Sequence, residues 1–318
     1  FSYSAKTIYS HLQASQILDQ QKITAQLQSL KTLNSANLQS DKINNWLNDP
    51  SMEPLLKEKL LYDATLVFRE AAENTFYNQA MQDLVNYQAE AYLPLNDGGH
   101  IIEVAAFQVA ASARATLLHW SINKNAQIAN TQLLANPDIF INQLSQLNNR
   151  DAALFGYLKT IDEADELQIN QIVNTVILTQ QKLPTRVLVN LAEKTADKDL
   201  YQILIDQYHH NSDHQSLIIK TLTSLPDSIS TLDKIALLTL AASKEGIADA
   251  AILALAQYVD TDAQVQNLLM TKLMSPQHGG SAAKAISGSK DLLILDKLKQ
   301  NLTNEDKLLI RRSLLALY

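Results

Sequence analysis

The stretch KDLYQILIDQYHHNSDHQSLIIKTLTSL (residues 198–225) decides the fold, because it matches KDLLILDKLKQNLTNEDKLLIRRSLLAL (residues 290–317) without a gap. Both stretches open with Lys-Asp-Leu, and they agree best near their ends, where 217–222 lies over 309–314. The offset of 92 residues is too long for one supersecondary unit and suits three. The pair of stretches therefore indicates an internal repeat.

A short core pattern recurs between and before these stretches. It has two small or apolar residues, two variable residues and then a large aliphatic residue. It starts at residues 154, 187, 218, 251, 282 and 310, with spacings of 33, 31, 33, 31 and 28 residues. Self-similarity at a nearly constant period is typical of repeat architectures, in which each unit buries its apolar side only against a neighbour.

Each unit is predicted to hold two helices. Apolar residues at helical spacing form single stripes, such as Leu200, Ile203, Leu204 and Tyr208. Helix starts are expected at five capping-box candidates: Thr160-x-x-Glu163, Ser212-x-x-Gln215, Ser230-x-x-Asp233, Thr261-x-x-Gln264 and Thr303-x-x-Asp306. We expect an all-α fold, an α-solenoid of about six antiparallel helix pairs.

A family resemblance rests on the last unit. Residues 281–286, 291–302 and 305–317 supply a small-residue helix, an aliphatic first helix, and a second helix with basic residues before a small-and-leucine run. This arrangement resembles a HEAT-like repeat of the short bacterial type, over roughly residues 137–318. The resemblance implies a helical repeat array and carries no catalytic residues.

The N-terminal part reads differently. Residues 3–47 and 52–88 show helical periodicity, and residues 109–120 are a further predicted helix, with 121–136 as a connection. Within 89–107, Asn96-Asp97-Gly98-Gly99 separates two apolar runs, which predicts a β-hairpin or extended loop. We expect two domains: 1–132, a helical region with the hairpin, and 133–318, the HEAT-like array.

Composition excludes several classes of protein. Seven glycines and seven prolines in 318 residues argue against a loop-rich or disordered chain. Without cysteine there is no disulfide, thiol catalysis or cysteine-ligated zinc. A net charge of −7, spread over both halves, does not suggest a nucleic-acid binder. No apolar run has the roughly 18 residues of a transmembrane helix.

The expected location rests on two further features. The chain begins at Phe1, which indicates that a signal peptide, a lipoprotein leader or an added segment was removed. Together with the absence of cysteine and the abundance of Asn and Gln, this favours a periplasmic or cell-envelope location over a cytoplasmic one.

The densest polar cluster is His209-His210-Asn211-Ser212-Asp213-His214. His209, His210 and His214 would supply three imidazoles to a metal such as zinc or nickel. The other interpretation is an inter-helix turn, with histidines at a helix C-terminus and Ser212 capping the next helix. The spacing matches no catalytic zinc motif, so neither a metal nor a cofactor is expected.

The predicted hairpin carries the second candidate site. Asp97, His100 and Glu103 lie at or near its turn, and loops that project from a helical scaffold often carry function. A contact with a partner is one interpretation of these residues, and a solvated turn is the other.

Two charged runs have structural explanations as well. Residues 162–166, DEADE, would have to face each other in a cleft to act as paired carboxylates, but they lie at a predicted helix start, where acids suit the helix dipole. Arg311, Arg312 and Lys307 would suit an anionic partner, yet the repeat pattern itself places basic residues there.

The main functional hypothesis is a binding scaffold without catalysis, which uses the curved surface of a helical array to hold a protein or peptide partner. The alternatives are a hydrolytic enzyme, or a metal-dependent regulator that uses the histidine cluster. The sequence does not indicate the oligomeric state.

Overall fold

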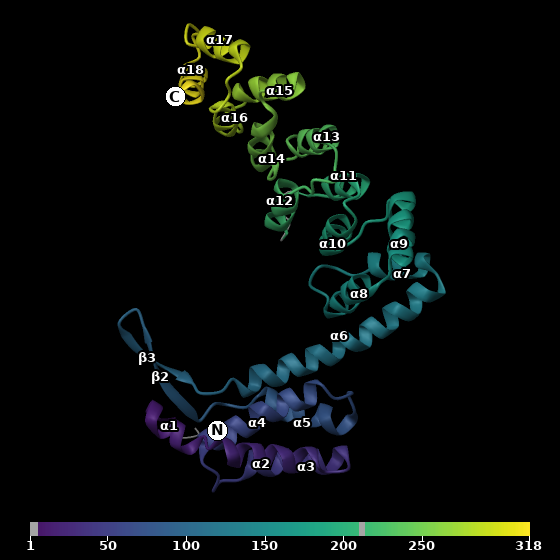
Figure 1. The fold of residues 1–318 in the computed structure, drawn as a ribbon, viewed down its shortest axis with the longest axis vertical. Helices are drawn as coiled ribbons and strands as arrows, with labels where there is room; N and C mark the ends of the chain where they lie inside the picture. The colour runs from purple at the N-terminus through teal and green to yellow at the C-terminus, as the bar shows by residue number, and fades with distance from the viewer. Residues whose placement is uncertain (1–5, 210–213) are drawn as a thin grey trace. The chain divides into compact units, whose positions relative to one another are not determined.

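The computed structural model describes residues 6–209 and 214–318. Within these ranges the chain is mostly helical, with eighteen α-helices and one small three-stranded sheet (Figure 1). It divides into two compact units, residues 1–125 and 126–318. The division falls seven residues before the predicted boundary at 132/133 and lies inside a helix, α6.

The N-terminal unit is a group of helices with a sheet beside them. Its elements are β1 (Thr7–Ile8), α1 (His11–Ile17), α2 (Gln20–Lys31), α3 (Ala36–Asn48), α4 (Pro54–Arg69), α5 (Thr75–Val85), β2 (Ala91–Asp97), β3 (His100–Ala105) and the first part of α6 (Val109–Ala135). Its main core includes Trp46, Phe68, Met81 and Trp120, all buried. Both tryptophans of the chain thus belong to this core.

The sheet contains the predicted hairpin. β2 and β3 pair antiparallel from Tyr92 opposite Ala105 to Asp97 opposite His100. Gly98 and Gly99 close the turn with φ of 57° and 93°, a region that glycine adopts without a steric penalty. The third strand, β1, pairs in parallel with β2 through Thr7 and Ile8. β1 lies within residues 3–47, which were predicted to be helical, so the prediction is wrong there.

The predicted connection at 121–136 is wrong, because α6 continues to Ala135. Two asparagines in this stretch have side chains that bond back along the helix. Asn125 Nδ2 donates to the Ser121 carbonyl at 2.8 Å, and the Asn123 amide lies 3.0 Å from His119 Nε2. Polar residues that satisfy themselves locally in this way do not interrupt a helix.

The C-terminal unit contains the remaining helices. They are α7 (Pro137–Ser145), α8 (Ala152–Glu163), α9 (Glu166–Thr179), α10 (Thr185–Thr195), α11 (Lys198–Asp206), α12 (Gln215–Thr223), α13 (Thr231–Ala241), α14 (Ala248–Ala254), α15 (Ala263–Leu273), α16 (Gly279–Ile286), α17 (Leu292–Asn301) and α18 (Lys307–Leu317), with a 3-10 turn, η1 (Leu255–Tyr258), after α14. Each of the six starts of the core pattern falls in an even-numbered helix, from α8 to α18.

The contacts between these helices follow their numbering. Each even-numbered helix from α8 to α16 contacts the next even-numbered one, and α7, α9, α11, α13 and α15 form an odd-numbered series. Figure 1 shows α12, α14 and α16 on one side and α11, α13 and α15 on the other. Cross contacts join the two series at α10–α11, α13–α14, α15–α16 and α17–α18.

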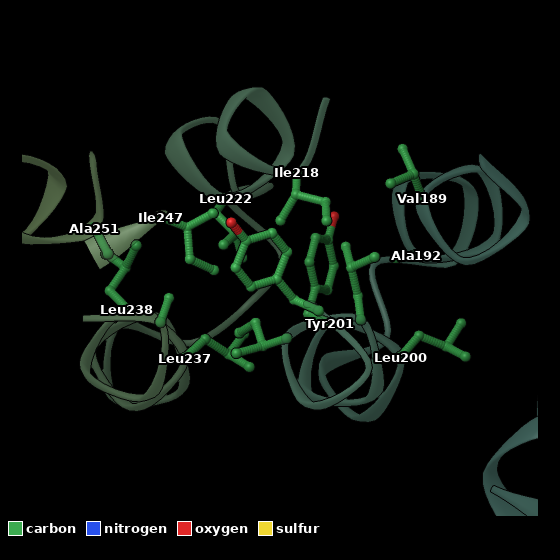
Figure 2. Close-up of a cluster of buried hydrophobic side chains, with 14 of the residues drawn as sticks. Val189, Ala192, Leu200, Tyr201, Ile218, Leu222, Leu237, Leu238, Ile247 and Ala251 are labelled. Carbon is green, nitrogen blue, oxygen red and sulfur yellow. The ribbon is translucent and has the colours of Figure 1, made fainter. Parts of the chain in front are cut away.

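One continuous core lies between the two series. Figure 2 shows Tyr201 of α11 among labelled side chains that come from α10 to α14, including Ala192, Ile218, Leu238 and Ala251. All of these are buried, and Tyr201 is fully so. The apolar core of the C-terminal unit therefore extends across successive helices.

The gapless alignment of residues 198–225 with 290–317 superimposes the starts of α12 and α18. It places the starts of α11 and α17 two residues apart. α12 and α18 begin 92 residues apart, whereas α11 and α17 begin at 198 and 292. The N-cap residue of α11 is Asp197, so Lys-Asp-Leu forms the first three residues of that helix. The N-cap residue of α17 is Asp291, which is itself the Asp of Lys-Asp-Leu. Burial follows the structural register, since Leu200 corresponds to Ile294 and both are buried.

Two of the capping predictions are wrong in position by one and three residues. The N-caps of α15 and α18 are Asp262 and Asp306 rather than Thr261 and Thr303. Thr160 lies inside α8, where its hydroxyl donates to the Ala126 and Gly156 carbonyls. Ser230 caps α13 as predicted, and Ser212 lies outside the described residues.

Among the described residues, no helix is long and apolar enough to cross a bilayer.

Candidate functional site

One hollow in the C-terminal unit lies where three inter-helix segments meet. They are the segment after α7, the segment before α10 and the segment after α11. The pocket has a volume of about 210 Å³. Its lining residues are Ser145, Leu147, Asn148, Asn149, Lys182, Leu183, Pro184, Thr185, Leu188, Leu204, Gln207, Tyr208, His209 and Ile218.

Side-chain amides fix the walls of this pocket. The Gln207 Oε1 accepts from the Leu183 backbone N–H at 3.2 Å, and its Nε2 donates to the Gln181 carbonyl at 3.0 Å. Asn149 Oδ1 accepts from the backbone N–H of Arg186 at 3.1 Å. Three segments that are distant in sequence are thereby tied together, which holds the pocket open without a long ordered loop.

The floor and the rim of the pocket differ in polarity. The floor consists of the buried side chains Leu183, Pro184, Leu188, Leu204 and Ile218, with Tyr208 among them. At the rim, Lys182 and His209 are exposed. No aspartate or glutamate is among the lining residues that the structure describes.

The N-terminus of α10 adds positive potential at the same place. Pro184 is its N-cap residue and makes no side-chain cap, and Thr185 is the first helical residue. The first turn of a helix carries the positive end of the helix dipole. Its N–H groups already have acceptors here, since Arg186 donates to Asn149 and both Val187 and Leu188 donate to the Pro184 carbonyl. The pocket thus combines an apolar floor with a cationic rim.

Tyr208 lines the pocket, but its hydroxyl oxygen has almost no accessible surface and so does not face the hollow. Its side chain is only 7% exposed, and its hydroxyl has no hydrogen-bond partner among the described residues. Burial, and secondarily the nearby charge of Glu245, raise the pKa of Tyr208. The phenol therefore stays protonated near neutral pH and is able to donate a hydrogen bond.

The structure does not assemble the three predicted metal-binding histidines into a described site. His209 lines the pocket, His214 is the N-cap residue of α12, and His210 lies outside the described residues. In the part of the chain that the structure describes, no group of three or more His, Asp or Glu residues is arranged to hold a metal ion. The metal hypothesis stays a prediction.

The hairpin candidates fall on two faces. Asp97 lies opposite His100 across the strands, so their side chains project to the same side. Glu103 lies opposite Pro94, three residues from His100, and therefore on the other face, where it forms an ion pair with Lys6. The structure brings Asp97 and His100 together and separates Glu103 from them.

The basic candidates near the C-terminus also separate. Lys307 and Arg311 are exposed, whereas Arg312 is 7% exposed. Its guanidinium donates to the carbonyls of Leu273, Ser275 and Pro276 at 2.9, 2.7 and 3.1 Å. Arg312 thus donates hydrogen bonds to carbonyl groups at and just after the end of α15. Its guanidinium is buried and is not exposed to a partner.

The acidic run before α9 has a structural role too. Asp165 caps α9 and forms a capping box with Gln168, and Asp162 accepts from Asn190 Nδ2 at 2.9 Å. The interpretation as a helix start is confirmed for Asp165 and Glu166 and is wrong for Asp162 and Glu163, which end α8.

No pattern in the sequence indicates the pocket. Tyr208 was recognised only as part of an apolar stripe, and Leu183-Pro184 suggests a helix start and nothing more. Whether a buried hydroxyl finds an acceptor depends on packing between units, which no local pattern reveals. No protein-family model, curated protein or solved structure matches this chain.

Proposed function

We propose that the protein is a non-catalytic scaffold that binds a protein or peptide partner, and that residues 133–318 form an α-solenoid of about six antiparallel helix pairs. The observation that supports this most is the pair of contact series, in which even-numbered helices follow even-numbered ones and odd-numbered helices follow odd-numbered ones. Stacks of this kind expose a long surface made of equivalent positions from successive units. The HEAT-like resemblance implies the same use.

The even-numbered helices offer such a surface. Their solvent-facing side chains include Lys220, Leu253, Lys284, Arg311 and Leu315, one or two from each helix from α12 to α18. These exposed cationic and apolar side chains would suit an acidic and apolar segment of a partner. Affinity would come from many modest contacts spread over several units rather than from one deep site.

A peptide-display selection against the full chain tests the scaffold function. We expect enriched peptides that bind in solution and are weakened about tenfold or more by Lys220→Glu together with Lys284→Glu, because two cations on the proposed surface are reversed. Lys297→Glu, an exposed lysine of the odd-numbered α17, is the matched control and should leave binding unchanged. Selections that enrich nothing, or equal effects of both changes, would refute the proposal.

A further inference from the structure

The hairpin of β2 and β3 leaves one edge of its sheet open. The strand order is β1-β2-β3, so among the described residues β3 pairs on one side only. Figure 1 shows the hairpin projecting beyond the helices of the N-terminal unit. An open edge exposes backbone N–H and C=O groups that are able to pair with a further strand.

The hydrogen bonds between β2 and β3 show which residues face the open edge. Ala106, directly after β3, donates from its N–H to the Ala91 carbonyl at 2.9 Å and therefore faces β2. Backbone direction alternates along a strand, so the even-numbered residues of β3 bond to β2. The odd-numbered Ile101 and Glu103 then direct their N–H and C=O groups outward. Pro94, which has no N–H, lies opposite Glu103, as this alternation requires.

The sheet blocks its other free edge but not this one. β1 pairs only with the first two residues of β2, and further along that edge Pro94 lacks the N–H group that another strand would need. β3 has neither lysine nor proline, the residues that commonly protect an edge. Its one carboxylate, Glu103, already forms an ion pair with Lys6. The edge of β3 is thus unprotected.

We propose that the open edge of β3 pairs with the same edge of a second copy of the chain, about a two-fold axis at Ile102. Two-fold dimers are the commonest homo-oligomers, and such an axis sets the two edges antiparallel. The sheets of the two copies would join into one sheet of six strands. This inference concerns the N-terminal unit and does not depend on the scaffold function.

Backbone direction and charge select the register. Because odd-numbered residues face outward, they must pair with odd-numbered residues of the copy, which puts the axis at a residue, and the longest ladders have it near the middle of β3. An axis at Glu103 sets two carboxylates directly opposite each other, which is destabilising. An axis at Ile101 sets Glu103 opposite Gly99, whose φ of 93° is not that of a strand. An axis at Ile102 pairs Ile101 with Glu103 twice and keeps the ladder within β3.

The apolar side chains favour the same register. Leu95 and Ile102 lie opposite each other on one face of the hairpin and are 49% and 42% exposed. Pairing about Ile102 places the two Ile102 side chains opposite each other, with Cβ atoms about 4.5–5.5 Å apart. A row of four apolar side chains, Leu95 and Ile102 of each copy, would then cross the joint sheet. The paired area is small, so we expect a weak, reversible dimer.

Sedimentation velocity of the full chain, from roughly 1 µM to roughly 1 mM, measures this association. We expect a monomer–dimer equilibrium in the upper part of the range. Ile102→Lys should weaken the dimer about tenfold or more, because two cations would face each other across the axis. Leu95→Lys is the matched control, since Leu95 is similarly exposed on the same face but lies one strand farther from the axis. It should weaken the dimer by less than about threefold.

Mixed variants test the register itself. Ile102→Lys and Ile102→Glu should each associate poorly alone, but their equimolar mixture should form a heterodimer, because opposite charges then face each other. Since the chain has no cysteine of its own, Ile102→Cys should also form a disulfide-linked dimer with oxidised glutathione, faster than Leu95→Cys. The Cα atoms of a non-hydrogen-bonded pair lie about 4.5 Å apart, within the range that a disulfide spans.

Four results would overturn the inference. A chain that stays monomeric up to about 1 mM has no such dimer. Equal losses for Ile102→Lys and Leu95→Lys would assign the association to another surface. A mixture of the two charged variants that associates no better than either alone would exclude pairing about Ile102. Pairing of an added extended peptide with β3 in a chain that stays monomeric would assign the edge to a strand of a different partner.

Discussion

At the scale of single residues, Arg312 shows how a buried cation is tolerated. Its three carbonyl partners lie at the end of α15 and just beyond it, where backbone oxygens have no helical donors. Lys272 and Lys194 act similarly, since their Nζ atoms donate to the carbonyls of Ala242 and Ile161 at 3.0 and 2.6 Å. These basic side chains thus donate hydrogen bonds to carbonyl groups at or near the C-terminal ends of other helices.

Gly279 is the residue that leaves room for Arg312. A Cβ at this position would lie 2.2 Å from Arg312 Nη1, whereas a Cβ on the adjacent Gly280 would meet nothing. We expect Gly279→Ala to lower the free energy of unfolding by about 1–3 kcal/mol, and Gly280→Ala to leave it unchanged or to raise it by up to about 1 kcal/mol. Chemical denaturation followed by circular dichroism measures both, and equal effects would contradict the packing described.

Glu58 is the buried carboxyl of the N-terminal unit. Its side chain is fully buried, and its Oε1 accepts from the backbone N–H of Ala91 at 3.0 Å and from that of Glu90. Tyr87 donates to the same oxygen at 3.4 Å, and Lys57 forms an ion pair with Glu90 at 2.9 Å. Burial raises the pKa of Glu58 despite these hydrogen bonds, and the charge of Glu90 adds to the increase.

A pH dependence of stability follows for this unit. Because the folded protein keeps the Glu58 proton to a higher pH than the unfolded chain does, the free energy of unfolding decreases as pH rises from the ordinary glutamate range through the raised pKa. Glu58→Gln should flatten this decrease, and exposed Glu70→Gln should not. Urea unfolding at several pH values, followed by tryptophan fluorescence, reports on this unit because Trp46 and Trp120 both lie in it. A Glu58→Gln profile as steep as that of the unchanged protein would refute the assignment.

At the scale of elements, helix starts were predictable in kind but less so in position. The sequence shows a cap residue near several starts, but Thr303 and Asp306 are both acceptable caps three residues apart. The structure selects Asp306, whose Oδ1 accepts from the N–H groups of Leu308 and Leu309 at 2.8 and 3.2 Å. The choice depends on which register buries Leu309 and Ala316 against the neighbouring helices, and that information is not local.

The two candidates for this cap make a direct comparison. Asp306→Ala should lower the free energy of unfolding by about 1 kcal/mol, because two N–H groups lose their acceptor. Thr303→Ala should change it by less than about 0.5 kcal/mol, since the Thr303 hydroxyl only donates to the Gln300 carbonyl on an exposed surface. Thermal unfolding of the two variants measures both changes in stability. A larger loss of stability for Thr303→Ala would favour Thr303, the cap predicted from the sequence.

The strands and α6 likewise include features that local sequence predicts and features that depend on distant residues. The turn glycines predicted the β2–β3 hairpin, because few other residues adopt such φ values. β1 was not predictable, since Thr7-Ile8 gains its strand only from pairing with β2, more than eighty residues away. The predicted helix at 109–120 was too short, since α6 continues to Ala135.

At the scale of the whole molecule, the helical period of the apolar residues predicted the high helical content that the described residues show. The pocket was not predictable, as it depends on three segments that meet only after the units pack. The N-terminal unit carries no repeat, and its arrangement of helices around Trp46 and Trp120 likewise follows from tertiary packing.

The central proposal, a progressing row of helix pairs in the C-terminal unit, is tested most directly by distances between spin labels. The chain has no native cysteine, so pairs can be introduced as Arg186→Cys with Lys220→Cys, Lys284→Cys with Arg311→Cys, and Arg186→Cys with Arg311→Cys. Packed helices lie about 8–10 Å apart, so the four steps from α10 to α18 predict roughly 35 Å between the end helices. A distance for the last pair well beyond the other two is the predicted result. Three similar short distances would show a closed bundle and contradict the row.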